Sequence, residues 1–233
     1  MSITLEYFGS LDNATGNLGL FELDPLIMEP IPALKYLRQK EKLDTFKCPA
    51  FTDYLKNVFY ICSPLDFTIV KENNKYAVIN DRDNSNLNQL LIVGLPETKS
   101  LNNQPMLGIL LQYMFLNKKD NISMQIIDPP LVSNPLTNVC GEFNISKWIR
   151  PTNFCFFLHE DCESISFKRG DPLYAVKFLT DKQIDFKLIL DEDKCMSILS
   201  EAQRAGSLKK WYPRLTLNQC YNLFANRMKN FWK

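Results

Sequence analysis

Apolar and polar residues alternate most clearly in the second half of the chain. Ile165 and Phe167 alternate with polar or charged neighbours, and residues 174–178 repeat this pattern with Tyr, Val and Phe at every second position. A period of two places one set of side chains on a buried face of a strand and leaves the other set near solvent. The stretch 163–178 therefore predicts two consecutive β-strands.

A corner of Arg169-Gly170-Asp171-Pro172 separates these two strands. Glycine accepts a positive φ, and proline at the start of a strand withholds a hydrogen-bond donor from the sheet. Shorter apolar or alternating runs predict further strands at residues 3–8, 66–71, 76–80, 90–95, 107–116 and 122–127, with the second and third of these forming a hairpin.

Helical patterns lie before and after these strands. Residues 33–42 predict a short charged helix, and the spacing of Phe51, Leu55 and Phe59, with Tyr54 and Val58 on an adjoining face, predicts an amphipathic helix or a turn packed on a sheet.

Two more helices are expected near the end of the sequence. Acidic residues at 191–193 suit the positive end of the first helix, Met196, Leu199 and Ala202 form its buried stripe with Ile198 alongside, and Gly206 is a natural terminator. Thr216 with Gln219 three residues later is the capping-box pattern that begins the second helix.

The order of these elements indicates an α+β protein that is mostly β. We expect a sheet-pair core of jelly-roll or β-clip-like kind, with peripheral helices and two C-terminal helices. Residues 1–190 would form the β-rich core domain, and residues 191–233 a helical pair packed on it as part of one structural unit.

The composition limits the classes of partner and the cellular compartment that we expect. The 27 basic and 26 acidic residues give a net charge of +1, which supplies no overall attraction to nucleic acid or anionic lipid. The seven cysteines include no CxxC pair, the first residues do not form a signal peptide, and no apolar run is long enough for a membrane span. We expect a cytoplasmic protein with no membrane partner.

Candidate catalytic chemistry is limited by a single histidine, His159. A site with two histidines and a carboxylate cannot form from this chain, and any Cys-His or Ser-His pair would have to use the same imidazole. The run His159-Glu160-Asp161-Cys162 offers metal ligands but is more typical of a solvated turn. Because no phosphate-binding glycine loop is present either, we expect no catalytic residues, no metal and no cofactor.

Two groups of residues are candidate binding sites. Trp148 and Arg150, two residues apart on an expected strand, would share a face where the guanidinium can stack on the indole, and Lys168, Arg169 and Asp171 lie near the next turn. This group would bind a small anion or a partner, although Trp-Arg stacking on an ordinary sheet surface is the commoner reason for the pattern.

The second group is basic and aromatic. Lys209, Lys210, Trp211 and Arg214 lie in the stretch 194–233, which has eight basic residues and one acidic residue. Aromatic rings beside cations can stack bases while the cations neutralise phosphates. The alternative is an exposed helical face whose aromatic side chains pack back on the sheet.

Two resemblances add to these patterns. Two segments resemble an uncharacterised domain family of tailed-phage and bacterial proteins. The first runs from Cys48-Pro49-Ala50 through Tyr54-Leu55-Lys56-Asn57 to Ser63-Pro64-Leu65-Asp66, and the second is Ile145–Pro151 followed by Gly170-Asp171-Pro172-Leu173-Tyr174. This resemblance implies a phage-encoded protein of an infected host cell or of the virion, and it implies no activity.

A weaker similarity is to the β-clip fold of dUTPase-like enzymes, in which a strand ends in a Gly-Asp turn as it does at Gly170 and Asp171. Pro172 replaces the basic residue of that pattern, and the family's Ser-Gly phosphate motif, uracil hairpin and glycine-rich arm have no counterparts. The similarity therefore carries no catalytic residues to this chain.

The leading functional hypothesis is a non-catalytic binding or assembly module that acts on a host or viral protein, with a homo-oligomer as an open alternative. A second hypothesis is an enzyme or sensor that binds a nucleotide or another small anion through Arg150, Lys168 and Arg169. A third is nucleic-acid binding through the basic and aromatic C-terminal residues.

Overall fold

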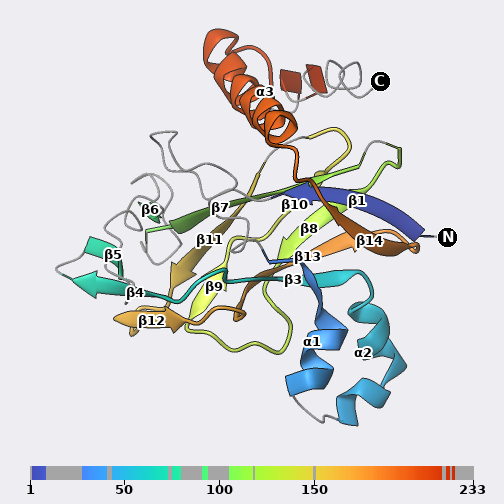
Figure 1. The fold of residues 1–233 in the computed structure, drawn as a ribbon. Coiled ribbons are helices and arrows are strands. Elements are labelled where there is room, and N and C mark those ends of the chain that lie inside the picture. Colours follow the sequence, from blue (N-terminus) through green and yellow to red (C-terminus); the bar gives the residue numbers. More distant parts are fainter. Residues whose placement is uncertain are drawn as a thin grey trace.

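The computed structural model describes residues 2–8, 28–40, 44–72, 75–79, 91–93, 105–117, 119–148, 151–216, 219–220 and 222–223. These residues form a mostly-β α+β protein with three sheets and with helices on its outer faces (Figure 1). The described strands do not close into a barrel.

The first sheet has six strands. In order across the sheet they are β14 (Gln183–Leu188), β1 (Ser2–Phe8), β7 (Leu107–Leu116), β11 (Thr152–Leu158) and β9 (Leu136–Asn138), with β6 (Leu91–Val93) also paired to β7. Strands β1 and β14 run parallel, and the other pairings in this sheet are antiparallel.

The other two sheets are antiparallel. The second sheet has the order β10 (Gly141–Asn144), β8 (Ser123–Ile127), β13 (Pro172–Leu179), β3 (Val58–Cys62) and β2 (Ile31–Pro32). The third sheet has the order β12 (Ser164–Phe167), β4 (Phe67–Glu72) and β5 (Lys75–Ile79).

One hydrophobic core joins all three sheets. Phe115 on β7 and Phe178 on β13 meet inside it, with ring centroids 5.6 Å apart, and Phe59 on β3 lies 5.9 Å from Phe178. Phe167 on β12 brings the third sheet into the same cluster, because its ring centroid lies 5.8 Å from that of Phe154 on β11. Interlocking rings from several strands fix how the sheets pack, because aromatic pairs prefer offset or edge-to-face contact.

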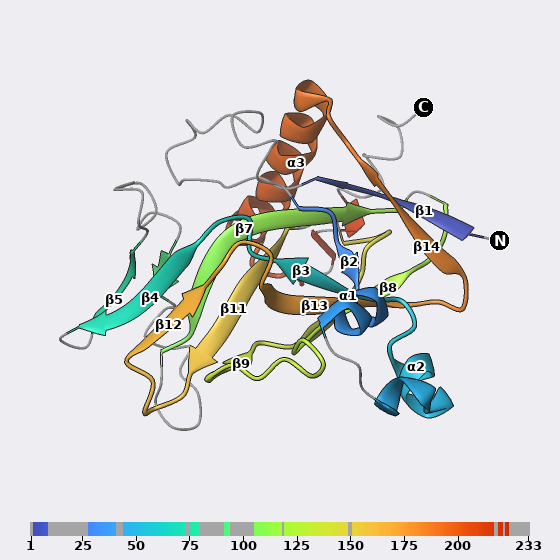
Figure 2. The same cartoon turned by 60° about the horizontal axis from the view of Figure 1, so that its bottom comes forward.

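Helices cover the outer faces of the two larger sheets. Helices α1 (Ala33–Lys40) and α2 (Pro49–Tyr54), joined by a short 3-10 turn (Asp44–Lys47), lie beside the outer face of β3, where Val58, Tyr60 and Cys62 are buried. Helix α3 (Glu192–Trp211) packs on Met114 and Leu116 of β7. Figure 2 shows α1 and α2 on the opposite side of the sheets from α3.

The structure confirms the strands and helix starts that had strong local signals. Ile165 and Phe167 are buried, while Ser164 and Ser166 between them are exposed. The Asp191 side chain caps α3 by accepting a hydrogen bond from the Lys194 N–H at 3.0 Å.

The capping box at Thr216 is also present. The Thr216 N–H donates to Gln219 Oε1 at 2.7 Å, and the Gln219 N–H donates to Thr216 Oγ1 at 3.2 Å. Most of the helix that should follow lies outside the described residues. The division into residues 1–190 and 191–233 stays a prediction.

The predicted helix through Phe59 is wrong. Helix α2 ends at Tyr54, and residues 58–62 form strand β3, which is buried throughout. The run Val-Phe-Tyr-Ile-Cys favours a strand because β-branched and aromatic residues suit a sheet. Both of its faces are covered, and the i, i+4 spacing runs from Phe51 in α2 through Leu55 in the following turn to Phe59 in the strand.

Packing also overturns three smaller expectations. On β13 the alternate face is covered too, since Leu173 and Ala175 are fully buried. Helix α3 continues through Gly206 to Trp211, because a glycine in a helix interior costs only about 1 kcal/mol. Met196 is exposed, and Cys195 joins Ile198, Leu199 and Ala202 in the stripe that faces β7.

Candidate functional site

An open depression of 1040 Å³ lies where β11 leads into β12. Its lining consists of the predicted His-Glu-Asp-Cys run and its neighbours: Lys71, Pro135, His159, Glu160, Asp161, Cys162, Glu163 and Ser164. The carboxylates here are exposed, as is the imidazole, so solvent screens their charges.

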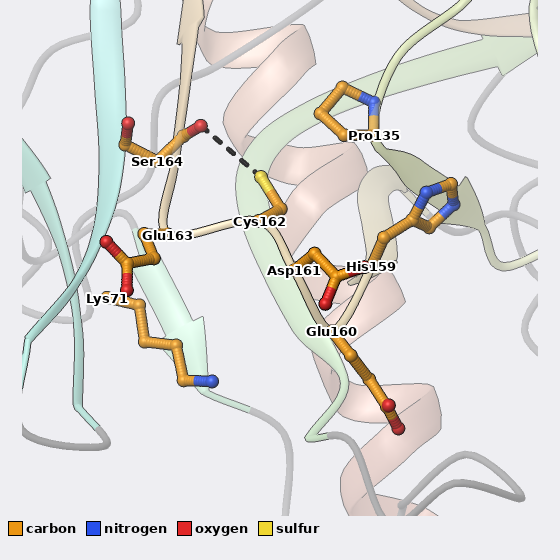
Figure 3. Close-up of a pocket in the computed structure, with 8 residues that line it drawn as sticks. All are labelled: Lys71, Pro135, His159, Glu160, Asp161, Cys162, Glu163 and Ser164. Atoms are coloured by element: carbon orange, nitrogen blue, oxygen red, sulfur yellow. Dashed lines mark hydrogen bonds between the residues drawn. The ribbon is translucent and has the colours of Figure 1, made fainter.

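The side chains in this depression do not form a catalytic pair. Nε2 of His159 lies 3.4 Å from the Thr137 hydroxyl, whereas the Cys162 thiol donates to the Ser164 carbonyl at 3.3 Å. Figure 3 shows the imidazole directed toward Pro135 and away from the Cys162 sulfur. Within the described part of the chain, no three His, Cys, Asp or Glu side chains gather as a metal site requires.

The predicted residues Lys168, Arg169 and Asp171 lie at the corner between β12 and β13, where Gly170 has a φ of +91°. A carboxylate already accepts from each of two backbone amides there. The Lys168 N–H donates to Asp171 Oδ2 at 2.8 Å, and the Arg169 N–H donates to Asp66 Oδ1 at 2.6 Å.

A small anion would compete with these carboxylates for the same amides. It would also be repelled by their negative charge. These contacts give the two carboxylates a structural role, and anion binding by the exposed side chains of Lys168 and Arg169 stays a prediction.

The same corner is joined to a distant part of the chain. The Ser63 N–H donates to the Asp171 carbonyl at 2.8 Å, and the Gly170 N–H donates to the Ser63 carbonyl at 2.9 Å. Residues 63–66 and 170–174, which belong to the two segments of the phage-family resemblance, thus lie against each other. Their contact is structural and does not test the resemblance.

Replacing Asp66 should measure this structural role. We expect Asp66→Ala to lower the free energy of unfolding by about 1 kcal/mol, because the Arg169 amide loses its acceptor. Asp66→Asn keeps an acceptor oxygen and should lose less. Urea unfolding followed by circular dichroism gives both values, and an Asp66→Ala protein as stable as the wild type would contradict the assignment.

Trp148 does not lie on a strand, contrary to the sequence prediction. It follows a turn at residues 145–147, and its ring meets Phe143 edge-on with centroids 5.6 Å apart. Arg150 lies outside the described residues, so its stacking on Trp148 stays a prediction. The turn forms because the N–H of Trp148 donates to the Asn144 carbonyl at 2.8 Å, which ends β10.

The basic and aromatic candidates lie at the end of α3. Lys209 and Lys210 are in its last turn, Trp211 is its final residue, and Arg214 follows in an exposed turn. The Trp211 side chain is 81% exposed and that of Tyr212 is 59% exposed. These two aromatic residues therefore do not pack back on the sheet.

Sequence reasoning missed an unusual turn at residues 129–132, named here the Leu131 turn. The Val132 N–H donates to the Pro129 carbonyl at 3.2 Å, and Leu131 has a φ of +58°. With Pro130 at the second position this is a type II turn, whose third position normally holds glycine or asparagine. The Pro-Pro pair followed by leucine was the available sequence signal.

A buried tyrosine, Tyr60, forms a hydrogen bond with the Leu131 turn. The Tyr60 hydroxyl donates to the Pro130 carbonyl, and the Tyr60 ring packs edge-on against Tyr36 with centroids 5.2 Å apart. Val132 packs against the cluster between α1, α2 and the second sheet. Leu131 itself stays 55% exposed.

Comparison of this chain with family models, curated proteins and solved structures finds no match. The resemblances to a phage and bacterial family and to the β-clip fold stay predictions. No helix in the described residues is long and apolar enough to cross a membrane.

Proposed function

We propose that this protein is a non-catalytic binding module that docks onto another protein, host or viral, through the Leu131 turn. The observation that supports this proposal most strongly is the left-handed backbone conformation of Leu131, whose side chain is exposed. A left-handed conformation costs a residue with a Cβ about 1 kcal/mol. Inside this chain the cost is not offset by burial of the side chain, which a partner's apolar pocket would supply.

The surroundings of the turn suit this role. The two prolines restrict the backbone before Leu131, and the Tyr60 hydroxyl donates to the Pro130 carbonyl, which directly precedes Leu131. A pre-ordered loop loses little conformational entropy on binding, so more of the interaction energy appears as affinity. An apolar side chain fixed at the tip of such a turn is suited to fill a pocket at the centre of an interface.

We also propose the finer fold description, a sheet pair of jelly-roll or β-clip-like kind. It is supported by the core shared between the two larger sheets. The parallel pairing of β1 with β14 is an addition to this description, because jelly rolls are built from antiparallel strands.

Leu131→Asn should raise stability and weaken binding at the same time. Asparagine adopts a positive φ more readily than leucine, so we expect the melting temperature to rise by about 2–4 °C. Leu190→Asn is the matched control, since Leu190 is 57% exposed and has no positive φ. The melting temperature of this control variant should not rise by a comparable amount.

Binding is tested with a photo-crosslinking amino acid placed at position 131 or, as a control, at position 190. In extract of the cells that carry the gene, we expect one protein to crosslink at 131 and not at 190. That protein, once purified, should bind Leu131→Asn at least about tenfold more weakly than wild type. Equal affinity, or no crosslink specific to position 131, would refute the docking role.

A further inference from the structure

Charge is distributed unevenly along the chain. Residues 194–233 hold eight basic residues and one acidic residue, Glu201. Subtracting these from the chain totals of 27 and 26 leaves 19 basic and 25 acidic residues in the first 193 positions. A segment of net +7 thus follows a segment of net −6, and such asymmetry is typical of a chain that meets a polyanion at one end.

The structure shows how the exposed end of α3 is built. Tyr212 caps the helix, its N–H donating to the Leu208 carbonyl at 2.8 Å. The Leu215 N–H donates to the Tyr212 carbonyl at 3.0 Å, and the Thr216 capping box follows at once. The turn that carries Trp211, Tyr212 and Arg214 is therefore held at both ends by backbone hydrogen bonds.

No acidic residue lies in this turn. Glu201 pairs with Arg204 at 2.6 Å, ten positions before Trp211, which is about 15 Å along a helix. Lysines in the last turn of a helix also complement its negative end, so Lys209 and Lys210 have an ordinary explanation. The helix dipole does not explain why the two large aromatic side chains that follow, Trp211 and Tyr212, are exposed to solvent.

We infer that the end of α3 binds single-stranded nucleic acid. Unpaired bases stack on the exposed rings of Trp211 and Tyr212, while the exposed Arg214 neutralises a phosphate. A single strand is favoured over a duplex because flat exposed rings need unpaired base faces. Helix α3 lies on the side of the sheets opposite to α1 and α2, which pack near the Leu131 turn, so this site is independent of the proposed docking surface (Figure 2).

The test uses a fluorescein-labelled thymidine oligonucleotide and the full chain, with fluorescence anisotropy measured over a series of salt concentrations. Trp211→Ala should weaken binding by about tenfold or more, since stacking on an aromatic ring contributes strongly for each base. Its melting temperature should stay at the wild-type value because the side chain is 81% exposed. Arg214→Gln should reduce the slope of log affinity against log salt by about 0.7.

Tyr54→Ala is the matched control. Tyr54 is also an exposed aromatic residue beside a cation, with Lys177 Nζ 4.7 Å from its ring centroid, but it belongs to α2. This variant should bind the oligonucleotide as wild type does. Absence of binding at low salt, or equal affinity of wild type and Trp211→Ala, would overturn the inference, as would equally tight binding of heparin or polyglutamate that is insensitive to Trp211→Ala.

Discussion

Between about pH 10 and pH 12 the folded protein should unfold cooperatively. Burial raises the pKa of the Tyr7 hydroxyl to about 12 and that of the Cys62 thiol to about 12. Burial also raises the pKa values of Tyr60, Tyr113 and Tyr174. All five groups must stay protonated in the folded core, so alkaline pH favours the unfolded chain.

The direction follows from which state releases protons first. Unfolded tyrosines titrate near 10.0 and an unfolded cysteine near 9.0, below the values in the folded state. The unfolded state therefore binds fewer protons as the pH rises, and the free energy of unfolding decreases. This contribution to stability is complete below about pH 9 and is lost as the pH rises through the folded-state values.

Circular dichroism and tyrosinate absorbance, recorded against pH, should change together. Tyr7→Phe removes one linked proton and should move the unfolding midpoint to higher pH, whereas Tyr212→Phe changes an exposed ring and should leave it in place. Ionisation of every tyrosine near pH 10 with the circular dichroism spectrum unchanged would refute the prediction.

Phe178→Ala should remove a large part of the stability of the fold. The Phe178 side chain is 1% exposed, and its ring centroid lies 5.9 Å from Phe59, 5.6 Å from Phe115 and 5.9 Å from Phe186. These partners come from both larger sheets, so truncation opens a cavity between them. A loss of about 3–5 kcal/mol is expected for such a change, out of roughly 5–15 kcal/mol for a whole protein.

The next residue along β13 provides the control. Leu179 is 41% exposed, and Leu179→Ala should cost less than about 1 kcal/mol. Urea unfolding of both variants gives the comparison. A Phe178→Ala protein within 1 kcal/mol of wild type would mean that the two sheets do not depend on this aromatic contact.

Local chemistry made part of this fold predictable. Apolar residues alternate with polar ones around Ile165 and Phe167, and in a strand such alternation places all the apolar side chains on one face. The structure confirms that both residues are buried. The capping residues Asp191 and Thr216 act on amides three positions away, so their role is readable in a short window of sequence.

Features that depend on distant segments were not predictable in this way. Val58 and Phe59 match a helical spacing, and only the cover supplied by α1 on one side and the central core on the other makes them a buried strand. Gly206 does not end α3 because packing of the first half of the helix on β7 outweighs one unfavourable residue.

In the candidate sites too, local features were predictable from the sequence, whereas contacts with distant segments were not. Lys168, Arg169 and Asp171 were rightly expected to lie near one turn, but no sequence pattern relates Asp66 to that turn, where its carboxylate accepts from the Arg169 amide. The carbonyl before Leu131 accepts a hydrogen bond from Tyr60 of β3, about 70 positions earlier in the chain. Such contacts become visible only in three dimensions.

The position of β1 between β7 and β14 has a consequence for biosynthesis. Tyr7 lies opposite Phe115 on one side and beside Leu188 on the other, so β1 gains its first neighbour only after residue 116 and its second only after residue 188 has left the ribosome. During translation Ile3, Leu5 and Tyr7 remain without the partners that bury them in the finished protein. The first sheet is therefore completed only after translation of β14, and we expect the exposed apolar residues of β1 to favour chaperone binding until then.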